Sequence, residues 1–73
     1  MQKTIYTKEH KKLIAKLIEA RQTSLLKQEE VAKLIKKTQS YVSKIEAGQK
    51  KIEIIELINL AKIYKQDLHF FLD

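Results

Sequence analysis

Apolar residues recur along most of this chain at the three- and four-residue intervals that are typical of amphipathic helices. The pattern predicts five helices, over residues 7–23, 28–35, 39–47, 54–64 and 68–72. Thr38 and Asp67 are suited to cap the third and fifth helices, and Gly48 is suited to end the third. We therefore expect a compact all-α fold in a single domain over residues 1–73, with residues 1–6 as a short lead-in.

Composition excludes several classes of protein. The 73 residues include one glycine, no proline and no cysteine. So few turn-forming residues argue against a many-stranded β fold and a glycine-rich phosphate loop. Without cysteine there is neither a disulfide nor a thiolate metal site. Unbroken apolar runs are too short to cross a membrane, so we expect a small cytoplasmic domain that does not bind one.

The charge of the chain is unevenly distributed. The formal net charge is +6, and residues 33–51 carry six lysines against one glutamate. Residues 52–73 are acidic and more apolar, with two lysines against four carboxylates. A basic middle and an acidic end indicate two faces with different partners, although each single lysine could simply be solvated surface.

Residues 28–47 have the spacing of a helix-turn-helix. Two short predicted helices are separated by about three residues, and the small side chain of Ala32 allows them to cross closely. Apolar contacts between them would come from Val31, Ile35, Val42 and Ile45. In such a motif the second helix lies in the major groove of DNA, and the first crosses the backbone.

Four short motifs occur in order around this segment. They are Arg21, QEEVA at residues 28–32, SKIEAG at 43–48 and LxxLA at 57–61. With these motifs, residues 9–72 resemble the phage repressor and Cro (XRE-like) family of helix-turn-helix DNA-binding proteins. The resemblance implies a five-helix lambda-repressor-like domain. It also implies a sequence-specific regulator of transcription that binds double-stranded DNA, with recognition helix 39–47 in the major groove.

The resemblance also implies roles for individual residues. Gln28 would bond a phosphate and support the recognition helix, and Arg21 would form a partly buried ion pair with Glu46. The residues expected to contact DNA are Gln28, Lys36, Lys37, Thr38, Gln39, Ser40, Tyr41, Ser43, Lys44, Gln49 and Lys50. Their chemistry agrees, because a Gln39 amide can pair with adenine and a Lys44 ammonium with guanine or phosphate. Tyr41 could give its hydroxyl to a phosphate, give its ring to a thymine methyl, or lie half-buried over the turn.

Several residues depart from the family pattern. Lys27 stands where a Ser or Thr N-cap is usual, and Leu25 and Lys36 stand where glycine is common. A non-glycine residue with positive φ at position 36 would cost about 1 kcal/mol, unless the turn is reshaped. Lys37 replaces an apolar turn residue and Ile52 replaces a frequent proline. These departures affect the expected turn geometry more than the expected fold.

A domain this small makes few contacts with DNA, so we expect a homodimer on half-sites about one turn, ~34 Å, apart. The predicted interface covers the C-terminal helices, residues 54–72, and its candidate residues are Leu57, Tyr64, Leu68, Phe70 and Phe71. The helix over residues 54–64 is apolar on more than one side. That pattern fits either an interface or a helix that is buried all round.

Two other functions are compatible with parts of the sequence. The chain could be an antitoxin-type interaction module that binds a partner protein and contacts DNA secondarily. A basic amphipathic membrane binder is disfavoured, because the charges surround a helix-turn-helix rather than one long helix. We expect no enzyme, cofactor or metal site. His10 and His69 lie in different helices without metal-ligand spacing and are expected at the surface, and the sequence contains no nucleophile with a matching base.

Overall fold

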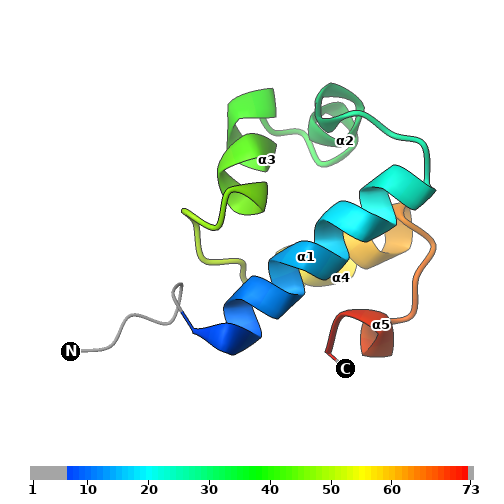
Figure 1. The fold of residues 1–73 in the computed structure, drawn as a ribbon. Helices are drawn as coiled ribbons and strands as arrows, with labels where there is room; N and C mark the ends of the chain where they lie inside the picture. Colours follow the sequence, from blue (N-terminus) through cyan, green and yellow to red (C-terminus); the bar gives the residue numbers. More distant parts are fainter. Residues whose placement is uncertain (1–6, 73) are drawn as a thin grey trace.

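The computed structural model describes residues 7–72, which form five α-helices (Figure 1). The helices are α1 (Lys8–Thr23), α2 (Gln28–Leu34), α3 (Gln39–Glu46), α4 (Ile54–Ile63) and α5 (Leu68–Leu72). The predicted all-α fold is confirmed, and each predicted helix is present with ends that differ by at most one residue. The lead-in expected at residues 1–6 lies outside the described residues.

The helices pack around α1. In Figure 1, α1 crosses in front of α4, α2 and α3 lie together above this pair, and α5 lies below it. α2 packs against α3, and α1 contacts both α3 and α5. All five helices contribute buried side chains to one core, namely Ile14, Leu17, Ala20, Val31, Ala32, Val42, Ile45, Leu57, Leu60, Ala61, Tyr64 and Phe71. The core therefore holds the helix-turn-helix rigidly on α1 and α4.

Four of these helices end in the same backbone turn. The residue after each helix cap has a positive φ, which is 60° at Leu25, 58° at Lys36, 76° at Gly48 and 56° at Lys65. Its N–H donates to the carbonyl three residues back, and the next N–H donates to the carbonyl five residues before it, as in the Schellman motif. Only glycine adopts this conformation without a Cβ clash, so the other three ends are strained. The turn at Lys36 keeps the left-handed geometry and is not reshaped.

Three residues expected at a dimer interface are buried inside the single chain instead. Leu57, Tyr64 and Phe71 are only 4%, 4% and 2% exposed. The prediction needs correction here, because the apolar stripe that carries these residues fills the chain's own core. The other two candidates, Leu68 and Phe70, are half-buried and pack against that core.

His10 also differs from expectation. It was expected at the surface but is buried, and it lines a pocket with Leu13 and Phe71. The helix pattern hides this, because the first turn of α1 lies against α5 only in the folded chain. His69 is exposed, as expected.

Candidate nucleic-acid interface

A side-chain hydrogen bond to a backbone N–H stabilises the start of each helix of the helix-turn-helix. Thr38 has an extended backbone, and its hydroxyl accepts the Tyr41 N–H at 3.1 Å, which starts α3 at Gln39. At the start of α2, Lys27 offers no side-chain cap, as its residue type predicts. Glu30 Oε1 accepts the Lys27 N–H at 2.8 Å instead, which provides half of a capping box.

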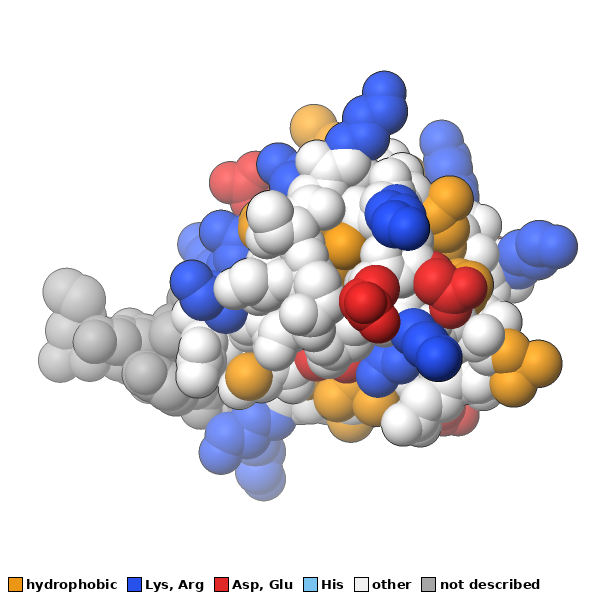
Figure 2. Space-filling view, turned by 90° about the horizontal axis from the view of Figure 1, so that it is seen from above, with side chains coloured by type: hydrophobic (Ala, Val, Ile, Leu, Met, Phe, Trp, Pro, Cys, Tyr) orange, Lys and Arg blue, Asp and Glu red, His pale blue; other side chains and the backbone are white. Residues whose placement is uncertain are grey.

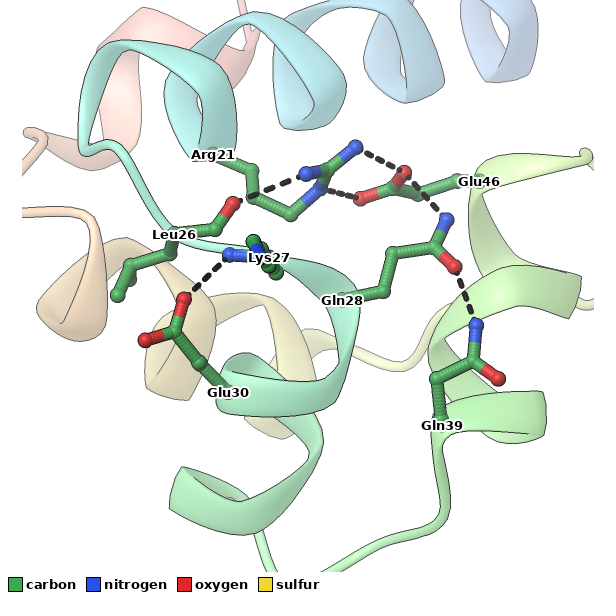
Figure 3. Close-up of polar contacts among 7 residues, drawn as sticks. All are labelled: Arg21, Leu26, Lys27, Gln28, Glu30, Gln39 and Glu46. Carbon is green, nitrogen blue, oxygen red and sulfur yellow. Dashed lines mark hydrogen bonds and ion pairs between the residues drawn. The ribbon is translucent and has the colours of Figure 1, made fainter.

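A chain of polar contacts connects α1 to the exposed beginning of α3 (Figure 3). Arg21 donates from Nε to Glu46 Oε2 at 2.7 Å and from Nη2 to Glu46 Oε1 at 3.0 Å, so the two expected partners form a bidentate ion pair. Gln28 Nε2 donates to Glu46 Oε1 at 2.9 Å, and Gln39 Nε2 donates to Gln28 Oε1 at 2.7 Å. Each residue therefore orients the next, and the last of them, Gln39, is exposed.

The ion pair at the base of this chain is well shielded from water. The side chains of Arg21 and Glu46 are 15% and 8% exposed, and a third Arg21 nitrogen donates to the Leu26 carbonyl at 2.9 Å. The hydrogen bond to Glu46 raises the pKa of Arg21 further above its usual range. The guanidinium is thus satisfied by the protein and serves to hold Glu46, and through Glu46, Gln28.

The residues expected to contact DNA all reach the surface. Seven are exposed, namely Lys36, Lys37, Thr38, Gln39, Ser40, Lys44 and Gln49, and four are half-buried, namely Gln28, Tyr41, Ser43 and Lys50. Figure 2 looks onto α2 and α3 from above and shows lysine and arginine side chains spread over this face, with acidic groups among them. The positive charge is therefore distributed around the helix-turn-helix rather than gathered in a pocket.

Tyr41 is placed differently from the other residues of α3 that were expected to contact DNA. Its hydroxyl donates to Glu56 Oε1 in α4 at 2.8 Å, and its ring lies 5.1 Å from Lys37 Nζ and 5.0 Å from Lys50 Nζ. Burial and the Glu56 carboxylate together raise the pKa of Tyr41 to about 12. Tyr41 is thus half-buried, and Glu56 accepts its hydroxyl hydrogen in the free chain.

Glu56 is a site residue that the sequence did not reveal. An acidic residue in the first turn of a helix is ordinary, because it favours the positive end of the helix dipole. Nothing in its spacing points to Tyr41, fifteen residues earlier in the chain. The contact depends on how α4 crosses α3, and only the folded chain shows that.

Comparison with protein families identifies the family to which this chain belongs. Residues 17–71 match the helix-turn-helix family over most of the chain. The chain belongs to that family. This helix-turn-helix protein is thus a DNA-binding regulator of the XRE type. Comparison with curated proteins and with solved structures gives no match.

Two further findings concern other kinds of site. Within residues 7–72, no helix is both long and apolar enough to cross a membrane. In the same residues, no three His, Cys, Asp or Glu side chains come together as a metal-binding group.

Proposed function

We propose that this protein regulates transcription by binding specific sequences of double-stranded DNA, with α3 in the major groove. The observation that carries the proposal is the hydrogen-bonded chain from Arg21 to Gln39. It holds an exposed amide in one orientation at the first residue of the recognition helix. A side chain fixed in this way is suited to read a base, because its geometry is set before binding.

Gln39 has the groups that adenine requires. Gln28 accepts one N–H of the Gln39 amide, which leaves the other N–H and Oε1 for a ligand. A donor and an acceptor side by side match N7 and N6 of adenine in the major groove. Ser40 and Lys44 are exposed on the same helix and complete the candidate set for base contacts.

The surrounding lysines supply affinity that does not depend on sequence. Lys36, Lys37 and Lys50 flank α3 in the turn before it and in the loop after it. Lysines placed on phosphates release counterions, so affinity falls steeply as salt rises. Two copies of the domain on a two-fold site would double both kinds of contact, and we propose that the protein acts as a homodimer.

Selection of bound duplexes from a random pool, followed by salt titration on the best duplex, tests this function. Gln39→Ala should relax preference at one base position and leave the salt slope unchanged. Lys50→Ala should weaken all sequences alike and reduce the slope by about one. Lys16→Ala serves as the control, because it removes the same charge from the side of α1 that faces Phe70 of α5, away from α3. Failure of the wild-type protein to enrich any sequence would contradict the proposed function.

A further inference from the structure

The three strained helix ends of this chain all lie around one place on its surface. Leu25, Lys36 and Lys65 have φ values of 60°, 58° and 56°, a conformation that glycine adopts more easily. Lys36 lines one of two adjoining pockets and Lys65 lines the other, while Leu25 lies between two residues that line the second pocket. The fourth helix end of this kind, after α3, carries Gly48 and lines neither pocket.

The side chains at these strained ends contribute little to the fold. Leu25 is 88% exposed, so its apolar surface stays in water. Lys36 and Lys65 are also exposed, and within residues 7–72 neither has an ion-pair partner. Strained backbone conformations gather at sites that bind ligands. The three ends together therefore point to a contact with something outside the chain.

The two pockets form one shallow groove among the C-terminal ends of α1, α2 and α4. They share Leu34, which is 58% exposed, and Ile63, so the floor of the groove is apolar in both pockets. At one end of the groove, the Ser24 hydroxyl donates to the Tyr64 carbonyl at 3.4 Å, which connects the ends of α1 and α4, and Figure 1 shows these two ends together. The core thus holds the groove in place.

Lysines surround the apolar floor of the groove. Lys36 and Lys62 line one pocket and Lys65 lines the other, while no acidic residue of the described chain lines either. An apolar floor between positive charges is complementary to a segment that carries both apolar and acidic side chains. We propose that the groove binds such an acidic, apolar segment of another protein. This partner is separate from the DNA of the proposed function.

The apolar floor favours a protein segment over two other occupants. A DNA backbone would pair with the lysines but offers little apolar surface to cover Leu34 and Ile63. A second copy of the chain has exposed apolar side chains elsewhere, such as Ile55 and Leu72, which line neither pocket. Pairing of two copies therefore does not require the groove. Lys36 also belongs to the proposed DNA contacts, so variants at the other two strained ends separate the two partners more cleanly.

Selection from a random peptide library tests the proposal without DNA. The library is first depleted on Leu34→Asp, which places a charge on the floor of the groove, and is then selected on the wild-type chain. Depletion removes the peptides that bind other surfaces. Enriched peptides should combine Asp or Glu with large apolar side chains, and the best of them, labelled with a fluorophore, gives affinities by fluorescence anisotropy. A wild-type chain that enriches no such peptide would contradict the proposal.

Two altered peptides separate the apolar contribution from the electrostatic one. Serine in place of the apolar residues keeps the charge, and amides in place of the acidic residues keep the apolar surface. Each altered peptide should bind at least about ten-fold more weakly than the selected one, because the groove offers both kinds of contact. Equal affinity of the serine peptide would show only the attraction of a basic protein for an acidic peptide, and the proposed site would fail.

Leu25→Gly is the decisive variant, because it removes the exposed leucine and relieves the strained backbone at the same time. It should fold at least as stably as the wild type, which circular dichroism during urea unfolding checks, yet bind the peptide about ten-fold more weakly. Leu72→Ala removes an exposed leucine from α5, outside the groove, and should bind as the wild type does. Unchanged peptide affinity in Leu25→Gly would overturn the proposal.

The charge of the groove has its own pair of variants. Lys65→Glu should weaken peptide binding about ten-fold, because it places a like charge beside the acidic segment. Lys11→Glu makes the same change on an exposed lysine near the start of α1, at the other end of that helix, and should change the affinity less than about two-fold. Equal losses in the two variants would mean that net charge, rather than this groove, attracts the peptide.

Two further measurements report the other occupants. Sedimentation should give the same association state for the wild type and Leu34→Asp, and a wild-type dimer that this variant breaks would assign the groove to a second copy. Affinity for a random-sequence duplex should fall no more in Lys65→Glu than in Lys11→Glu, and a larger fall would assign the groove to DNA. Peptide binding by a chain that enriches no duplex sequence would contradict only the proposed function, and enrichment without peptide binding would contradict only this site.

Discussion

Tyr41 contacts two of the lysines that surround α3, because its ring lies 5.1 Å from Lys37 Nζ and 5.0 Å from Lys50 Nζ. The two lysines belong to different segments, one before α3 and one after it. A long, flexible side chain loses conformational freedom when it settles on a phosphate, and an earlier contact with an aromatic ring reduces that loss. We therefore expect Tyr41 to act as a positioning residue for the two lysines, and Glu56 accepts a hydrogen bond from its hydroxyl.

Replacement of the ring should weaken DNA binding without changing sequence preference. Tyr41→Leu should lower affinity about five-fold for every duplex, because both lysines lose their support. Tyr41→Phe keeps the ring and should remain within about two-fold of wild type. Affinities for a selected and a scrambled duplex measure this effect. A change in preference at one base position in Tyr41→Leu would show that the ring reads DNA directly.

At the scale of the helices, three helix ends carry a non-glycine residue with positive φ, and the sequence predicted only some of them. Leu25 and Lys36 occupy positions where the family has glycine, and both have positive φ. The third strained end, at Lys65, had no such signal, because nothing in the sequence distinguishes it from an ordinary surface lysine. The caps were easier to predict, since Thr38 and Gly48 have the residue types that their positions demand.

Leu25 offers a clean test of this strain, because its side chain is 88% exposed and contributes little packing. Leu25→Gly should raise the free energy of unfolding by about 1 kcal/mol, since glycine adopts positive φ without a Cβ clash. Leu25→Ala keeps the Cβ and should gain much less. Urea unfolding of the three proteins measures the difference. Equal gains in both variants would show that exposure of the leucine, rather than the backbone, carries the cost.

The apolar pattern of the C-terminal helices predicted their positions but not their partners. A buried stripe looks the same in sequence whether its own chain or another chain covers it. Leu57 and Tyr64 therefore seemed suited to an interface, although they fill the core, whereas the exposed isoleucine Ile55 lies outside the stripe. The Arg21–Glu46 ion pair could be predicted from the family resemblance. The contact between Tyr41 and Glu56 could not, because it depends on how α3 and α4 pack.

Across the whole molecule, the core and the recognition surface share one electrostatic cluster. Tyr64 ends α4 and is 4% exposed, and the charges of Glu46 and Arg21 both act on its phenol. Glu46 also accepts a hydrogen bond from the Gln28 amide, and Gln28 in turn accepts one from Gln39 and orients it. The residue that orders the proposed base contact thus also influences ionisation in the core.

This cluster predicts how stability should change at high pH. Burial, assisted by the Glu46 carboxylate and opposed by Arg21, raises the pKa of Tyr64 from 10.0 to about 12. The folded chain therefore favours the neutral phenol. The contribution of Tyr64 to the stability of the fold is complete at pH values below 10.0, the pKa of the phenol in the unfolded chain. This contribution is lost as the pH rises toward about 12.

Tyr64→Phe should remove that part of the pH dependence. In this range one such group lowers the free energy of unfolding by up to about 1.4 kcal/mol per pH unit, because the unfolded chain releases a proton that the folded chain keeps. Urea unfolding of both proteins at neutral and alkaline pH measures the two slopes. Tyr41 contributes in the same direction, so Tyr64→Phe should flatten the curve without making it level, and Tyr41→Phe should flatten it further. Parallel curves for wild type and Tyr64→Phe would mean that the buried phenol ionises as readily in the folded chain as in the unfolded one.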